Sequence, residues 1–161
     1  LQALIESGNA TVLFVTADTY SRYIHPQDWS ARLLFGDGAV ASWFRAIDAD
    51  RDRGIVDVAA GTAGAHFNKM VLQRNNLSFE DVDWFVFHQA SRVVLDTLIQ
   101  LLSLNRGRTL ESLAQFGNTV SASIPLTMHE AQRQGRLRAG QSTLLCGFGA
   151  GLSWGTALLR L

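Results

Sequence analysis

The sequence is poor in cysteine and proline, has no excess of one charge, and contains no long apolar run. Cys146 is its single cysteine, which excludes an intrachain disulfide and a metal site built from several cysteines. Basic and acidic side chains number 14 each, a balance that argues against a nucleic-acid or membrane-surface role. No apolar stretch approaches the roughly 20 residues that span a bilayer, and no basic and apolar leader is present. We therefore expect a cytoplasmic domain without nucleic-acid or membrane partners.

The chain has 161 residues and 47% hydrophobic content, enough for one domain-sized core. Residues 1–9 read as the last turns of a helix that ends at Gly8. Because the apolar stripe of this helix is already running at residue 1, we expect the sequence to be part of a longer protein. His25, His66 and His129 share no metal-ligand spacing, so no metal site is expected.

Alternating strand and helix patterns predict an α/β domain. Strands are expected at Thr11–Thr16, Arg32–Phe35, Ala39–Phe44, Gly54–Ala60, Val82–Phe87, Ser142–Phe148 and Ser153–Leu161. Helices are expected at Phe67–Asn76, Arg92–Leu102 and from Ser121 or Ser123 to Gln134, and a charged turn at Asp48–Arg53.

Three of these elements carry more detailed expectations. The Thr11–Thr16 strand is rich in β-branched and aromatic residues and is expected to be buried. Ser91 is expected to cap the second helix, whose apolar stripe would be Val93, Val94, Leu98, Leu101 and Leu102. The last two strands flank Gly149–Gly151, a pattern typical of an antiparallel hairpin.

Two polar residues follow buried elements and are the strongest functional signal. The apolar run that starts at Val82 stops abruptly at His88-Gln89, and a Gly-Asn corner places Asn118 ahead of a helix. Residues just past strand ends line the ligand crevice of an open α/β sheet, so His88 and Asn118 are candidates for one site. Alternatively, His88 is a hydrogen-bonded strand end and Asn118 is a turn residue.

Four strings in order resemble the 3-oxoacyl-acyl-carrier-protein synthase III family of the thiolase superfamily. They are Leu34–Ala39, Phe87–Ala90, Gly117–Pro125 and Gly147–Gly155. The resemblance implies a layered αβαβα thiolase-like fold. Residues 1–50 would be the end of its first repeat, and residues 51–161 the second repeat that carries the histidine and the asparagine. It also implies a homodimer with Thr11–Thr16 near the interface.

The resemblance further implies a decarboxylative Claisen condensation in fatty-acid or related biosynthesis. An acyl-CoA would acylate a cysteine, and malonyl acyl carrier protein would supply the attacking carbanion, with no cofactor. By resemblance, neutral His88 and Asn118 stabilise the enolate, and the backbone amide of Ala150 helps to form the oxyanion hole. The family nucleophile lies upstream of this sequence. Cys146 does not replace it and is expected to be an inert, buried thiol.

Weaker substrate contacts come from positions that surround these motifs. Ser91 stands where the family usually has asparagine, and Phe87 precedes the histidine. Trp29 could stack on adenine, but the simpler interpretation is that its side chain packs over its own loop. Arg92 could bind an acidic carrier protein, although a solvated arginine is the simpler interpretation.

One segment departs from the family pattern. The family carries several tens of residues between the strand like Gly54–Ala60 and the helix like Phe67–Asn76, so we expect a chain break near residues 61–66.

Two other functions stay open. One is a nucleophile-free thiolase-fold partner or binding subunit, and the other is a related acyltransferase with the same Cys-His-Asn set.

Overall fold

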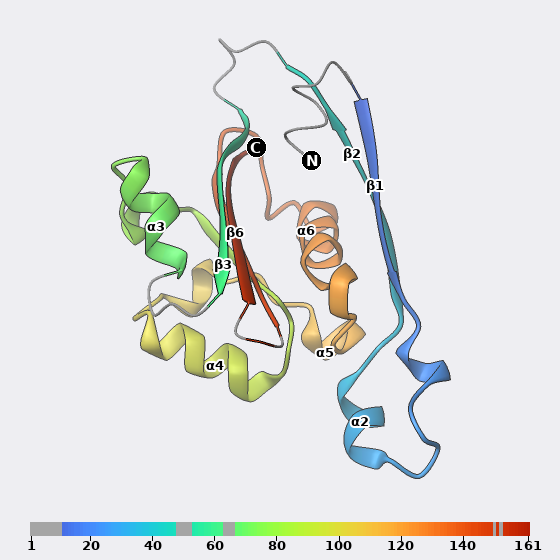
Figure 1. The fold of residues 1–161 in the computed structure, drawn as a ribbon. Helices are drawn as coiled ribbons and strands as arrows, with labels where there is room; N and C mark the ends of the chain where they lie inside the picture. Colours follow the sequence, from blue (N-terminus) through green and yellow to red (C-terminus); the bar gives the residue numbers. More distant parts are fainter. Residues whose placement is uncertain (1–10, 48–52, 63–66, 150, 152) are drawn as a thin grey trace.

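The computed structural model describes residues 11–47, 53–62, 67–149, 151 and 153–161, and for residues 67–69 it describes the backbone alone. These residues form two sheets and several helices, arranged in layers (Figure 1). Within the described ranges, no helix has the length and apolar character needed to cross a bilayer.

The larger sheet has four strands in the order β3-β6-β5-β4. Strand β4 (Trp84–Phe87) pairs in parallel with β5 (Ser142–Phe148), whereas β6 (Ser153–Arg160) pairs antiparallel with both β5 and β3 (Gly54–Thr62). The hairpin expected from the last two strands is therefore confirmed.

Strand β4 is buried on both faces, as its continuous apolar run predicts. Phe85 and Phe87 join a hydrophobic cluster with Leu95 on one side of the sheet. Val86 points the other way, into a second cluster with Leu110. The two clusters form the core. Because they hold β4 on both faces, the residues that follow its carboxyl end, His88 and Gln89, have a fixed position.

Helices cover both faces of this sheet. Figure 1 shows α3 (Phe67–Arg74) and α4 (Arg92–Leu101) on one side, and α5 (Leu113–Phe116) and α6 (Ser123–Arg133) on the other. The second sheet lies beyond α6, so the order of layers is helix, sheet, helix, sheet. Helix α6 ends as expected, with Gly135 in a left-handed conformation at φ 71°.

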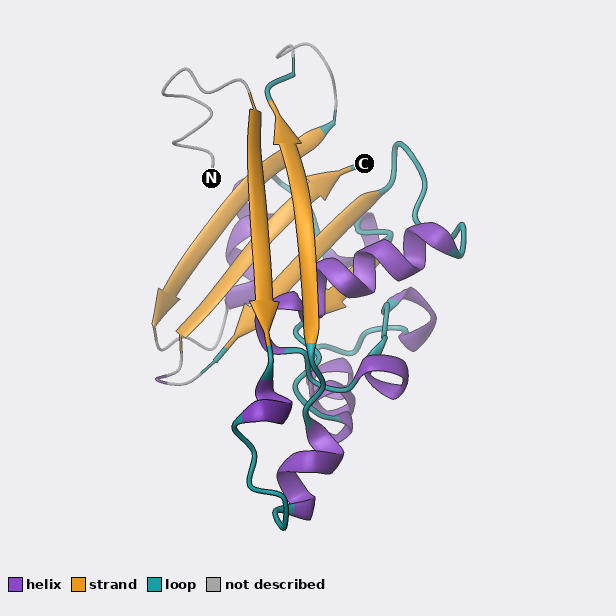
Figure 2. Ribbon diagram, turned by 90° about the vertical axis from the view of Figure 1, so that its right-hand side faces the viewer, coloured by secondary structure: helices purple, strands orange, loops and turns teal. Residues whose placement is uncertain are grey.

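The second sheet is the hairpin of β1 (Thr11–Asp18) and β2 (Gly38–Arg45), seen face-on in Figure 2. The prediction that the Thr11–Thr16 strand is buried is wrong for the described chain. Leu13 is 64% and Val15 59% exposed, and Trp43 on the partner strand is 72% exposed. The β-branched and aromatic pattern indicates a strand correctly, but burial depends on what covers the strand, which the pattern does not contain.

The strand expected at Arg32–Phe35 is also wrong, because α2 (Trp29–Leu34) occupies this position. The carboxylate of Asp28 accepts a hydrogen bond from the Ala31 amide and caps the helix. A run of four apolar or long side chains fits a strand and a helix equally well, and the N-cap decides between them.

The apolar stripe expected for α4 needs correction. Ser91 does cap the helix, through a hydrogen bond from the Val94 amide. However, Val93 is exposed, and so is Leu101, whereas Leu95 and Ile99 face the core. Leu98 and Leu102, both predicted, pack against the same core cluster as Leu95, so the predicted stripe is right at these two positions and wrong at Val93 and Leu101.

Several expectations fall on residues outside the described ranges. They are the helix end at residues 1–9, most of the charged turn at Asp48–Arg53, and most of the expected break at 61–66. Strand β3 continues through Gly61 and Thr62, so these two residues belong to the sheet. The other predicted strands and helices agree with the structure to within a few residues.

Candidate active site

His88 continues the β4 strand by one hydrogen bond and then leaves the sheet. Its backbone amide donates to the Cys146 carbonyl at 2.8 Å. Its ring packs edge-on against Phe148, with 5.7 Å between ring centroids, and its Nδ1 lies 2.6 Å from the Ser123 hydroxyl oxygen. Burial lowers the pKa of His88, because a charged imidazolium is poorly solvated there. The site therefore favours the neutral imidazole near pH 7.

Asn118 is held in place by a backbone bridge to a distant segment. Its amide donates to the Leu34 carbonyl at 2.8 Å, and its carbonyl accepts from the Gly36 amide at 3.0 Å. Gly117 precedes it at φ 67°, a conformation that a side chain would strain. The Gly-Asn corner is thus a fixed junction between the helix α5 region and the segment that leads into β2.

The side chain of Asn118 reaches the segment that carries His88. Its Nδ2 donates to the Ala90 carbonyl at 3.1 Å, and its Oδ1 accepts from the Val120 amide at 2.9 Å. Ala90 is itself tied back to His88, through a hydrogen bond from its amide to the His88 carbonyl at 2.9 Å. Asn118 is therefore attached to the segment that carries His88, and among the described residues the second N–H of its amide has no hydrogen-bond partner.

Val120 adopts a left-handed conformation with φ 51°. A β-branched residue is rarely found there, and the strain costs about 1–2 kcal/mol. The hydrogen bond to Asn118 Oδ1 holds the Val120 amide in this turn. Local strain at this loop is consistent with a site that must keep Asn118 in one orientation.

The Gly-Asp-Gly string at 36–38 is explained by close packing against the Asn118 loop. A Cβ atom added at Gly36 would lie 1.9 Å from the Phe116 carbonyl oxygen. One added at Gly38 would lie 2.8 Å from Cβ of Thr119. Between them, Asp37 accepts hydrogen bonds from the backbone and hydroxyl of Ser21, which lower its pKa. The two glycines therefore support the site, because they let the backbone of residues 36–38 pack directly against the loop that carries Asn118.

Gln89 is a site residue that the sequence reasoning did not single out. Its side chain is fully buried, and its Oε1 accepts from the amides of Ser112 and Leu113 at 3.0 and 3.2 Å. Its Nε2 donates to the Phe87 carbonyl at 2.8 Å. Gln89 therefore joins the end of β4 to the start of α5, the helix that leads to Asn118. An uncharged amide directly after a buried strand was the available signal.

Replacing Gln89 by methionine should destabilise the protein by about 3 kcal/mol or more, since it leaves buried amides of α5 without an acceptor at about 1–3 kcal/mol each. Methionine keeps the length and fills the space. Urea unfolding would measure the change, with the exposed Gln73→Met as the matched control. Equal midpoints for the two variants would contradict the assignment.

The weaker substrate-contact predictions fare differently. Ser91 caps α4, so its hydroxyl is engaged with the Val94 amide. Phe87 is 1% exposed and packs in the core cluster, and its predicted substrate contact stays a prediction. Trp29 is exposed at the start of α2, with the Arg32 guanidinium 5.6 Å from its ring centroid. Ala150 lies outside the described residues.

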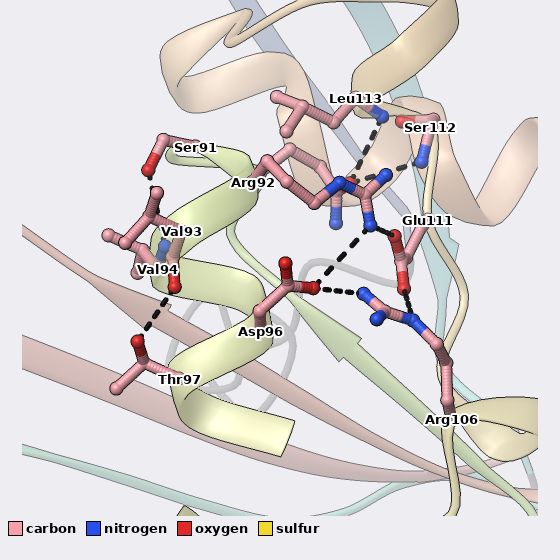
Figure 3. A network of polar contacts seen from close by, with 11 residues as sticks. Ser91, Arg92, Val93, Val94, Asp96, Thr97, Arg106, Glu111, Ser112 and Leu113 are labelled. Atoms are coloured by element: carbon pink, nitrogen blue, oxygen red, sulfur yellow. Dashed lines mark hydrogen bonds and ion pairs between the residues drawn. The ribbon is translucent and has the colours of Figure 1, made fainter. Parts of the chain in front are cut away.

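Arg92 is part of a network of alternating charges, shown in Figure 3. It contacts Glu111 at 2.5 Å and Asp96 at 3.7 Å. Arg106 bridges the same two carboxylates. Two cations and two anions balance, so Arg92 does not present an uncompensated positive charge to a carrier protein.

Cys146 is buried in β5, and burial raises the pKa of its thiol to about 12. It is therefore not a thiolate near neutral pH, and the prediction of an inert, buried thiol is confirmed. Among the residues that the structure describes, no three His, Cys, Asp or Glu side chains gather closely enough to hold a metal ion.

The lowered pKa of His88 predicts a loss of stability at mildly acidic pH. Folded His88 stays neutral while unfolded His88, with an ordinary pKa of 6.5, takes up a proton as the pH falls. The stability that is present above this value is lost as the pH falls through it toward the lower folded-state pKa. Between about pH 7.5 and pH 5.5, the urea midpoint should fall less in His88→Gln than in the parent. A His25→Gln control should behave like the parent; equal falls in all three proteins would refute the prediction.

Two family models match adjoining parts of the chain. The model for 3-oxoacyl-[acyl-carrier-protein] synthase III matches residues 1–64, and the model for the C-terminal part of the same enzyme matches residues 72–161. The division into repeats at 1–50 and 51–161 stays a prediction.

Curated relatives are β-ketoacyl-[acyl-carrier-protein] synthases III. The Anaplasma marginale relative is 32% identical over 200 aligned positions that include 100% of this chain and 62% of that protein. The Pseudomonas aeruginosa relative (strain LESB58) is 33% identical over 199 positions, covering 98% of this chain and 60% of its own. The chain thus spans about 60% of such relatives. Since it has only 161 residues, the relatives carry additional residues inside the aligned region.

Solved structures agree with the sequence matches. The crystal structure of 3-oxoacyl-(acyl carrier protein) synthase III from Pseudomonas aeruginosa PAO1 superposes with a TM-score of 0.89 and 34% identity, over 98% of this chain and 60% of that one. This similarity confirms the expected α/β, thiolase-like fold. The chain belongs to the 3-oxoacyl-[acyl-carrier-protein] synthase III family.

Proposed function

We propose that the protein of which this chain is a part is a condensing enzyme of the 3-oxoacyl-acyl-carrier-protein synthase III type. It would join an acyl group from an acyl-CoA to malonyl acyl carrier protein in fatty-acid or related biosynthesis. The observation that carries the proposal is the attachment of Asn118 to the backbone of the segment that holds a neutral, partly buried His88.

The chemistry follows from the charge that develops during decarboxylation. The malonyl carbon–carbon bond breaks, carbon dioxide leaves, and the electron pair moves into the thioester as an enolate. One N–H from neutral His88 and the remaining N–H of Asn118 would bind the enolate oxygen. Donors fixed in a dry site contribute a few kcal/mol each, because they need no reorganisation as charge appears.

The second step forms the new carbon–carbon bond. The enolate carbon attacks an acyl group held as a thioester, and the cysteine thiolate leaves. We place this cysteine upstream of Leu1, as in the family pattern. Cys146 cannot fill the role, since it is fully buried and its pKa is raised to about 12. Thioesters already activate both reactants, so the scheme uses no cofactor.

The assembly and compartment are also proposals. The exposed Leu13, Val15 and Trp43 on the β1–β2 hairpin support a homodimer that covers this sheet. A contiguous exposed apolar surface usually marks an interaction site. The balanced charge of the sequence supports a cytoplasmic enzyme that does not bind nucleic acid.

The test is a product assay on the purified full-length protein with acetyl-CoA and malonyl acyl carrier protein. Mass spectrometry should detect an acyl-enzyme, released carbon dioxide and a 3-oxoacyl carrier product. Acyl transfer without carbon dioxide release would indicate a related acyltransferase instead. Absence of both acylation and product would indicate a partner or binding subunit.

A further inference from the structure

Ser123 is the hydrogen-bond partner of the His88 ring. It opens helix α6, is 1% exposed, and places its Oγ 2.6 Å from His88 Nδ1. The two residues are 35 positions apart in the sequence, so the contact depends on the tertiary fold. A short contact in a buried place fixes both the position of the ring and the location of its proton.

The donors and acceptors around the Ser123 hydroxyl determine the direction of its hydrogen bond with His88. Its Oγ also lies 3.4 Å from the backbone nitrogen of Gln89, which can only donate. The oxygen therefore accepts from Gln89 and has one hydrogen left to give. Within the described chain, His88 Nδ1 is the acceptor that the structure offers to this hydrogen.

The reverse arrangement is less favourable. If Nδ1 carried the proton and donated to Ser123, the serine oxygen would accept twice and its own hydrogen would lack an acceptor in these contacts. A buried hydroxyl that loses its acceptor is costly. Ser123 donating to Nδ1 satisfies all three groups, and it leaves the single proton of the neutral imidazole on Nε2.

We propose that Ser123 is a positioning residue that holds neutral His88 in the Nε2–H tautomer, so that Nε2 is the donor to the substrate. This inference rests on the proposed condensing function for its consequence, but not for its geometry. Asn118 lies between α5 and α6, and Ser123 is the first residue of α6. Both bind the His88–Ala90 segment, Asn118 at the Ala90 carbonyl and Ser123 at the Gln89 amide. The stretch of chain from Asn118 to Ser123 thus orients both donors.

The test measures the tautomer directly in the full-length protein. Selective 15N-histidine labelling separates protonated from unprotonated ring nitrogens by NMR, and the His88 signals are those missing in His88→Gln. We expect Nε2–H in the parent, a mixture or Nδ1–H in Ser123→Ala, and recovery of Nε2–H in Ser123→Thr. Ser142→Ala, which removes another buried serine hydroxyl, should leave the tautomer unchanged.

Kinetics supply the second arm. In Ser123→Ala, kcat for condensation should fall about tenfold or more, but less than the 10²–10³-fold expected on loss of a donor itself, with KM for acyl-CoA nearly unchanged. An unchanged tautomer in Ser123→Ala, or Nδ1–H in the parent, would overturn the proposal even if kcat falls. Because the NMR measurement needs no substrate, failure to detect condensation would refute the proposed function without deciding the role of Ser123.

Discussion

Replacing either His88 or Asn118 should slow condensation by about 10²–10³-fold, the usual effect of removing one fixed donor from an oxyanion site. The physical reason is that each side chain offers one N–H to the enolate oxygen. Asn118→Asp is the sharper variant, since it keeps the acceptor for the Val120 amide and the size of the side chain but removes the donor. Steady-state kcat with malonyl acyl carrier protein measures the loss.

Acylation of the upstream cysteine separates this effect from misfolding. The first half-reaction needs no enolate, so both variants should still form the acyl-enzyme by intact mass. His129→Ala, which removes an exposed histidine on α6, should leave both half-reactions unchanged. Full condensation by Asn118→Asp would refute the donor role of the amide.

Gly36→Ala should be the most damaging single-methyl change for stability, costing about 3 kcal/mol or more through overpacking. The new Cβ would lie 1.9 Å from the Phe116 carbonyl oxygen, and this neighbour is backbone that cannot swing aside. The two segments must separate, which also breaks the hydrogen bond from Gly36 to the Asn118 carbonyl. Thermal or urea unfolding measures the cost.

Gly155→Ala is the matched control for this prediction. A Cβ at Gly155 in strand β6 would lie within 4 Å of no atom of the described residues, so the same chemical change should alter stability little. Equal unfolding midpoints for Gly36→Ala and Gly155→Ala would contradict the close approach of the Gly36 segment to the Phe116 carbonyl.

The position of the site could be predicted from the sequence because it depends on local signals. The apolar run of β4 stops at His88, and a Gly-Asn pair marks the corner at Asn118. His88 lies just past the end of β4, where residues line the crevice of a sheet, whereas Asn118 follows α5 and meets the His88–Ala90 segment through a tertiary contact. The Ser91 cap and the final hairpin were predictable because they also depend on local signals.

The supporting contacts could not be predicted, because they join residues that are distant in the sequence. Ser123 meets His88 across 35 positions, and Gln89 meets Ser112 across 23. The local pattern marks Gln89 as a polar residue after a buried strand and Ser123 as a residue near a helix start, but it does not name the partner of either one. The exposed hairpin strand was misjudged for a related reason, since burial is a property of the neighbours and not of the strand.

A double-mutant cycle on condensation tests the central claim that His88 and Asn118 donate to one oxygen. kcat would be measured for His88→Ala, Asn118→Asp and the double variant. Two donors to a single enolate oxygen act as a unit, so the double variant should lose much less than the product of the single losses. Losses that multiply fully would contradict the shared oxygen, and no loss in either single variant would contradict the site itself.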